Sequence, residues 1–141
     1  MEDLKQYLHS SPAIHGVARS ADGQLREFHR KGVVDLYDLI TNEPSFLAGG
    51  QLADRIIGRG AALLAVKGGV ASVHADLISE PALEVLTDAQ VPLSYDRLVP
   101  HIINWTGDGM CLVEALTLDT NDLDEAYRRI GKFLEPRRAT L

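Results

Sequence analysis

The stretch of sequence that decides the fold is residues 54–69, which read DRIIGRGAALLAVKGG. Asp54 is a favourable N-cap, and Gly68-Gly69 supplies a left-handed C-cap. Between them, residues 55–67 carry apolar side chains on nearly every side of the predicted helix, and such a helix is buried within its domain. The pattern therefore predicts a central buried helix over 55–67. Small residues allow another backbone to approach it closely: Gly58, Gly60, Ala61 and Ala62.

Helical and strand patterns alternate on both sides of this stretch. Before it, we expect a helix over 2–10, strands over 13–19 and 24–29 joined by an Asp-Gly turn, and a helix over 33–40. After it, we expect strands over 70–79, 91–95 and 98–103, and helices over 79–89, 110–117 and 121–134. A hairpin followed by alternating helices and strands predicts the α/β class, as a three-layer α/β/α arrangement with a mixed sheet.

Composition and charge narrow the class of protein. The 141 residues are 45% hydrophobic and 24% charged, which is typical of one globular domain over 1–141. Within it, residues 1–11 form an N-terminal helix and 136–141 a loose tail. A net charge of -6 argues against nucleic-acid partners, and no apolar run is long enough to span a membrane. With one cysteine and no signal peptide, we expect a cytoplasmic protein.

Three sequence blocks together resemble one family. They are ADRIIGRGAA at 53–62, SEPALEVL at 79–86 and IINWTGDGMC at 102–111. The family is an uncharacterised bacterial domain of unknown function that is placed in the cytidine-deaminase-like fold. The resemblance implies that fold over most of the chain, and a homo-oligomer as a common assembly. Two positions depart from the family pattern: Trp105 replaces an arginine after the asparagine, and Leu112 replaces a proline after the cysteine.

Zinc-dependent deaminase chemistry is not expected, because the ligand motifs H-x-E and P-C-x-x-C are both absent. The corresponding segments read GRG at 58–60 and PALE at 81–84. One cysteine cannot supply two thiolates, and the five histidines show no helical pair at ligand spacing. We therefore expect no metal site and no cofactor.

Polar residues gather instead at three predicted helix starts, and the resemblance implies that such starts face a cavity. This pattern predicts a metal-free binding site for a small molecule, either a nucleotide-like or another anionic ligand. A buried arginine such as Arg59 needs an anionic partner from the protein or a ligand. The predicted ligand-binding residues are Asp54, Arg59, Ser79, Glu80, Asn104, Thr106, Gly107 and Gly109.

Simpler structural roles and two other functions remain open. Asp54, Ser79 and Glu80 are also explained by helix capping, and the glycines by a tight turn. In one alternative, the chain is a zinc-independent enzyme with Cys111 as nucleophile and Glu114 or Glu80 as the proton-transfer group. Cys111 also fits a small buried apolar residue. In the other alternative, the apolar helices serve an oligomeric interaction module without a ligand.

Overall fold

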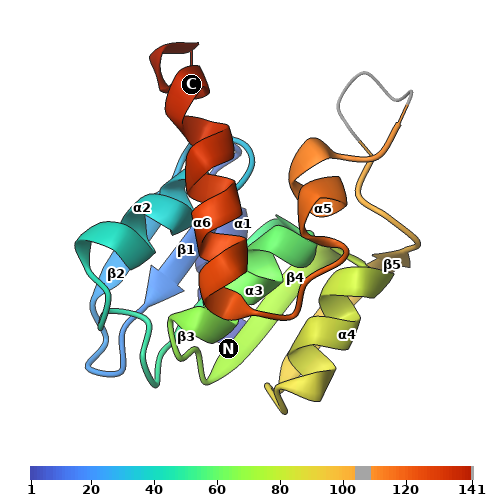
Figure 1. The fold of residues 1–141 in the computed structure, drawn as a ribbon. Helices are drawn as coiled ribbons and strands as arrows, with labels where there is room; N and C mark the ends of the chain where they lie inside the picture. Colours follow the sequence, from blue (N-terminus) through green and yellow to red (C-terminus); the bar gives the residue numbers. More distant parts are fainter. Residues whose placement is uncertain (104–108, 141) are drawn as a thin grey trace.

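The computed structural model describes residues 1–103 and 109–140, which contain five strands and six α helices. The strands are β1 (Gly16–Arg19), β2 (Leu25–Phe28), β3 (Gln51–Ile57), β4 (Ser72–Ser79) and β5 (Leu93–Val99). The helices are α1 (Glu2–His9), α2 (Val34–Asn42), α3 (Arg59–Lys67), α4 (Glu80–Asp88), α5 (Leu112–Thr117) and α6 (Leu123–Leu134). A 3-10 helix, η1 (Glu135–Thr140), follows α6 (Figure 1).

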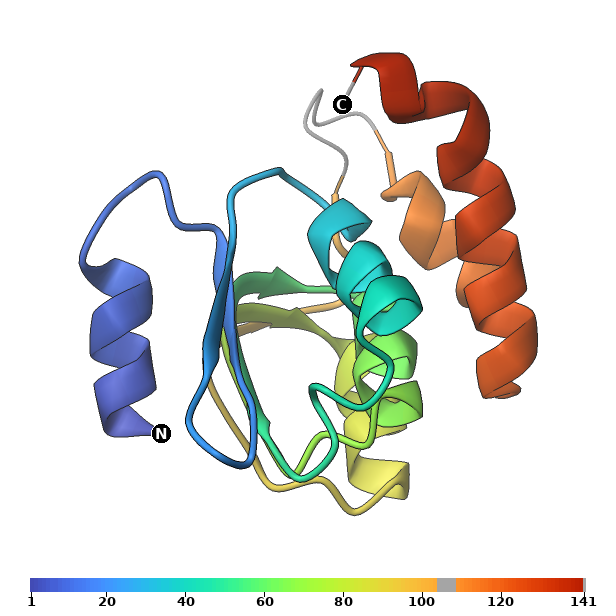
Figure 2. The ribbon, with the colours of Figure 1, turned by 90° about the vertical axis from the view of Figure 1, so that its left-hand side faces the viewer.

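The five strands form one mixed sheet in the order β2-β1-β3-β4-β5. β1 is antiparallel to both β2 and β3, whereas β3, β4 and β5 are parallel. Helix α1 lies alone on one face of the sheet, and the other helices lie on the opposite face (Figure 2). The predicted α/β class, the mixed sheet and the three layers are therefore confirmed.

Two apolar clusters hold these layers together. The larger one lies between the sheet and helices α2, α3, α4 and α6, and includes the fully buried Leu52, Leu64 and Leu86. The smaller one lies beneath α1, where Leu4 and Leu8 pack against Val17 of β1 and Ala53 of β3. Leu4 and Leu8 are one helical turn apart, so both face the sheet.

The amino-terminal half of the deciding stretch is a strand, and the prediction of a helix from residue 55 is wrong there. β3 runs through Asp54 to Ile57, and α3 begins at Arg59 after Gly58, whose extended backbone occupies the N-cap position. β3 pairs with β1 on one side and β4 on the other. Hydrogen bonding to these two neighbouring strands stabilises an extended backbone, and the β-branched residues Ile56 and Ile57 favour it as well. Together these effects outweigh the local helical periodicity of residues 54–57.

Other predicted boundaries change in the same way. The two strands predicted over 91–95 and 98–103 are one strand, β5, and Ile103 instead makes an isolated bridge with Met110. The tail predicted to be loose continues as η1.

The hairpin and the helix ends at Ser79, Gly69 and Asp122 are confirmed: Ser79 and Asp122 accept backbone N–H groups, and Gly69 has a φ of 80°. In the described part of the chain, no helix is long and apolar enough to cross a membrane.

Gly60 lets α3 approach α5 closely. A Cβ at this position would lie 2.5 Å from Val113 Cγ1 and 3.3 Å from Ile130 Cδ1. We expect Gly60→Ala to lower the free energy of unfolding by about 1 kcal/mol, because overpacking exceeds the helix propensity that alanine gains. Urea unfolding of G60A, V113A and the double variant tests this. The two single effects should sum to about 1 kcal/mol more than the effect in the double variant, and strict additivity would contradict the contact.

Candidate functional site

The buried carboxylate of Glu114 joins three segments at the carboxyl ends of the parallel strands. Its Oε1 accepts the backbone N–H of Arg59 at 2.8 Å and the Ser79 hydroxyl at 2.5 Å. Its Oε2 accepts the backbone N–H of Ile102. Glu114 is 1% exposed. One side chain from α5 therefore fixes the start of α3, the start of α4 and the segment after β5.

The start of α3 is suited to this contact for two reasons. Arg59 contributes one of the free N–H groups that every helix start presents, and a carboxylate there is favoured by the helix dipole. Gly58 leaves room for it, because a Cβ at Gly58 would lie 3.3 Å from Glu114 Oε1 and 3.1 Å from Ile102 Cγ1. The glutamate thus replaces the cap that Gly58 cannot supply from a side chain of its own.

The Arg59 side chain turns toward the α5–α6 connection. Its Nε donates to the Thr117 carbonyl at 2.8 Å, and its Nη2 donates to the Thr120 carbonyl at 2.8 Å and to Asn121 Oδ1 at 2.6 Å. A longer contact of 3.4 Å joins Nη1 to the Pro81 carbonyl. Neutral oxygens therefore satisfy this buried guanidinium, and the anionic partner that the sequence led us to expect is not required to do so.

Ser79 is fully buried and serves two elements at once. Its Oγ accepts the Ala82 N–H as the cap of α4 and donates its hydroxyl proton to Glu114. Glu80, the next residue, begins α4 and is exposed. The capping role considered for Ser79 is confirmed, and the hydroxyl is already engaged with protein groups.

Asp54 lies in β3, away from this junction. A Cβ at Gly16, its partner on β1, would lie 2.7 Å from Asp54 Oδ2, so this glycine makes space for the carboxylate. Burial raises the pKa of Asp54 to about 7, although N–H groups of Ile56 and Arg55 lower it in part. Asp54 therefore does not cap α3; its Oδ1 accepts the Ile56 N–H at 3.2 Å.

The third predicted block lies partly outside the described residues, including Asn104, Thr106 and Gly107. Gly109 is half-buried and precedes Met110, which pairs with Ile103. Cys111 is half-buried at the N-cap position of α5, and its N–H donates to the Ile102 carbonyl at 2.8 Å. Because Glu114 already accepts three hydrogen bonds, its predicted role as a proton-transfer group for Cys111 gains no support.

An apolar groove of about 390 Å³ lies beside the junction. Ile56, Leu77 and Arg97, which are paired neighbours on β3, β4 and β5, form its floor. The wall is the segment that follows β5: Val99, Pro100, His101, Ile102 and Ile103. Ile56 is 52% exposed and Ile103 57% exposed. This volume falls within the range of sites for small molecules, and the carboxyl ends of parallel strands are their usual place.

Two cationic or ionisable groups line the otherwise apolar groove. Arg97 has no hydrogen-bond or ion-pair partner within residues 1–103 and 109–140. The His101 Nδ1 is a buried atom that lacks a hydrogen-bond partner among the same residues, and it lies 3.9 Å from Glu114 Oε2. A guanidinium that no described residue pairs with, set beside apolar walls, suits a ligand that combines an anionic group with an apolar body.

A second hollow, of about 460 Å³, lies at the other end of the sheet between the β1–β2 turn and the segment after α2. Its charged groups are already paired: Asp22 accepts from Ser20 and Gln24, and Glu43 accepts from Arg26 at 2.8 Å. The first groove is therefore the better candidate, although this hollow is larger.

Three of the residues that the sequence analysis names lie together in the structure, because Glu114 contacts both Arg59 and Ser79. It did not indicate Arg97, His101 or the apolar groove lining. The available signal was the position of Arg97 near the carboxyl end of a parallel strand. The predicted strands over 91–95 and 98–103 leave Arg97 between them, whereas in the structure it lies within β5.

Replacing Glu114 tests the junction. In Glu114→Gln, an amide nitrogen must face the N–H of Ile102 or of Arg59, so one buried donor loses its acceptor. We expect the free energy of unfolding to fall by about 2 kcal/mol, as measured by urea denaturation. Glu84→Gln on the exposed side of α4 is the matched control and should change it by less than about 0.5 kcal/mol. Equal effects in the two variants would contradict the role of Glu114.

The raised pKa of Asp54 predicts a pH dependence of stability. Between the ordinary value of 3.8 and about 7, the native state binds more protons than the unfolded state, so stability falls as pH rises through this window. Asp54→Asn keeps the acceptor for Ile56 and removes the charge. At pH 8 this variant should be more stable than the wild type by at least ~1 kcal/mol, with no difference below pH 4. Urea unfolding across this range measures it; parallel stability curves would refute the assignment.

The comparisons with known proteins agree on one family. The model of a family described as "Domain of unknown function (DUF1893)" matches residues 6–134. The chain is also similar to a DUF1893 family protein (TM1506) from Thermotoga maritima, known from its crystal structure, with 28% identity and a TM-score of 0.77. That match covers 84% of this chain and 80% of the other. No curated protein matches. Because the family model spans nearly the whole chain, the protein belongs to the DUF1893 domain-of-unknown-function family.

Proposed function

We propose that the chain binds a small anionic molecule with an apolar or aromatic body, and that the site is the groove at the carboxyl ends of β3, β4 and β5. The observation that carries this proposal is the Arg97 guanidinium, which lines an apolar groove and has no partner within the described residues. An arginine in this setting recognises carboxylate or phosphate by two parallel hydrogen bonds.

The groove lining favours a ligand that Arg97 holds directly over a ligand that a bound metal ion holds. Among the described residues that line it, His101 alone carries a metal-ligating side chain. Ile56, Leu77 and Val99 provide apolar contact for a ring or an alkyl chain, and such contact contributes about 25 cal/mol for each Å² removed from water. A nucleoside monophosphate combines both features, so it is the first ligand class to test.

The fixed geometry around Glu114 supports a preformed site. Ile102, in the wall of the groove, is held by its N–H bond to Glu114 and its carbonyl bond from Cys111. A wall that is already ordered costs less conformational entropy when the ligand binds. The proposed arrangement keeps the deaminase-like architecture that the resemblance implies, but it uses the sheet ends in place of the zinc motifs as the binding element.

Matched ligands test this proposal. We expect adenosine monophosphate to raise the melting temperature and to bind with a dissociation constant at least tenfold lower than that of adenosine, because only the nucleotide offers an anion to Arg97. Isothermal titration calorimetry measures both. Octanoate, an anion with an alkyl body, serves as a second probe of the same chemistry.

Arg97→Gln should lower the affinity for the bound anion at least tenfold, which is about 1.4 kcal/mol. The control is Arg128→Gln, which removes the same charge from the exposed side of α6, where Arg128 pairs with Glu125. Absence of binding by adenosine monophosphate and octanoate at millimolar concentration, or equal binding by R97Q and R128Q, would rule the groove out.

A further inference from the structure

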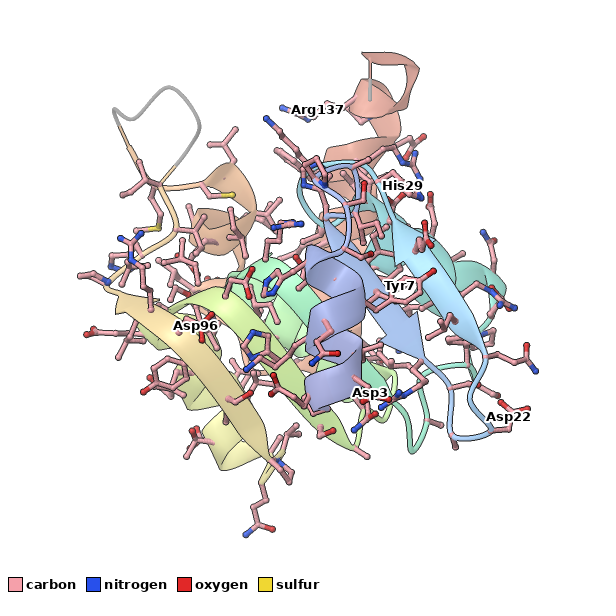
Figure 3. The ribbon with its side chains drawn as sticks, turned by 180° about the vertical axis from the view of Figure 1, so that it is seen from behind. Asp3, Tyr7, Asp22, His29, Asp96 and Arg137 are labelled. Atoms are coloured by element: carbon pink, nitrogen blue, oxygen red, sulfur yellow. The ribbon has the colours of Figure 1, made fainter. Side chains whose placement is uncertain are left out.

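A second cluster of side chains lies on the face of the sheet that carries α1, separate from the groove. It contains His74 and Asp76 on β4 and Asp96 on β5, and His9 at the end of α1 contacts Asp76. Figure 3 looks onto this face, with α1 in front and Asp96 labelled on β5. His74 and Asp76 are two positions apart on one strand, so their side chains share one face of the sheet.

Two imidazoles converge on one carboxylate in this cluster. The Nε2 of His9 lies 2.8 Å from Asp76 Oδ2 and 3.0 Å from Oδ1. The Nε2 of His74 lies 2.9 Å from the same Oδ1. One potential ligand atom each from His74, Asp76 and Asp96 lies within 4.8 Å of the others. Three metal-ligating side chains from β4 and β5 therefore meet at one point, and His9 from α1 reaches this group through its contact with Asp76.

The second ring nitrogen of His74 is fixed by a separate contact. His74 is fully buried, and its Nδ1 lies 2.9 Å from the Ser94 hydroxyl on β5. Because the Asp76 carboxylate accepts from Nε2–H, Nδ1 of the neutral ring accepts from the Ser94 hydroxyl. With an ion on Nε2, the ring proton would lie on Nδ1 and donate to Ser94 Oγ, and this outer contact is typical of histidines that ligate metals.

The two carboxylates, Asp76 and Asp96, also indicate a cation site. The register that pairs His74 with Ser94 and Leu77 with Arg97 also places Asp76 beside Asp96. Like charges at neighbouring positions of adjacent strands destabilise a sheet. Asp96 has no hydrogen-bond or ion-pair partner in the part of the chain that the structure describes. A bound cation between the two aspartates would remove this repulsion.

We propose that His9, His74, Asp76 and Asp96 form a binding site for one divalent transition-metal ion of the zinc type. Two imidazole nitrogens favour zinc, cobalt or nickel over magnesium and calcium, which prefer oxygen ligands alone. Two aspartates balance the charge of the ion. Tetrahedral zinc keeps its ligand atoms about 3.3 Å apart, so small side-chain rotations would complete the site by lengthening the contacts with Asp76 and shortening the wider separations.

This site differs from the zinc site of deaminases and from the groove described above. It lies beside the end of α1, on the face of the sheet that carries this helix, whereas the resemblance placed the deaminase ligands at the starts of the helices on the other face. The ion would join the end of α1 to β4 and β5, which α1 leaves uncovered. The expectation of no metal rested on histidine spacing along the sequence, and His9 and His74 meet only because α1 packs across the sheet.

Metal titration of the untagged chain after chelator treatment tests the proposal. We expect calorimetry to show one zinc ion per chain, and cobalt to produce the visible absorption bands of a four-coordinate nitrogen and oxygen site. Zinc should raise the melting temperature. Magnesium and calcium should bind at least a hundredfold more weakly. His9→Gln and Asp96→Asn change ligands with exposed side chains, so both variants should fold, and each should lower zinc affinity at least tenfold.

The matched controls are His29→Gln and Asp88→Asn, at an exposed histidine and an exposed aspartate outside the cluster. Circular dichroism confirms folding in all four variants. Zinc binding that is unchanged in H9Q and D96N, or that is lost equally in H29Q and D88N, would place the ion elsewhere and overturn the proposal. Failure of zinc and cobalt to bind at 0.1 mM free ion, taken as roughly the weakest affinity of a specific site, would also overturn it.

Discussion

The structure depends on the burial of one carboxylate. Removing Glu114 from water is costly unless every oxygen is hydrogen-bonded, and the chain meets this requirement with donors from three different segments. The starts of α3 and α4 and the segment after β5 must therefore lie at fixed positions relative to α5. The glycines at 58 and 60 ease the approach, because a Cβ at 60 would collide with Val113 and a Cβ at 58 would crowd Ile102 and Glu114.

Arg59 extends this network to the last two helices. Its backbone contacts Glu114, while its side chain holds the carbonyls of Thr117 and Thr120 between α5 and α6. A buried guanidinium usually indicates an anion, but here peptide oxygens take that place. Polar residues at a helix start are thus insufficient to identify a binding site, since the same residues can instead hold neighbouring segments of the chain in place by hydrogen bonds.

On the face of the sheet that carries α1, the helix covers only some of the strands, and both proposed sites use the strands that it leaves exposed. Helix α1 contacts β1 and β3, and the apolar cluster beneath it includes Ala53 of β3 but no residue of β4 or β5 among the described residues. Beyond it, β4 and β5 present the His74, Asp76 and Asp96 cluster. The next residues along the two strands, Leu77 and Arg97, belong to the groove. The two proposed sites are therefore neighbours along the same strands, while their ligand chemistry differs.

The sequence alone determined the class of fold, the hairpin, α2, α4, α6 and their caps, because these depend on local periodicity and on residues such as Ser79, Asp122 and Gly69. It also indicated that Arg59, Ser79 and Glu114 mattered. Only the tertiary structure decided that residues 51–57 form a strand, because pairing with β1 and β4 outweighs their helical pattern. It likewise brought His9 to Asp76 and Arg97 to the groove, since contacts between residues distant in sequence follow from packing and register.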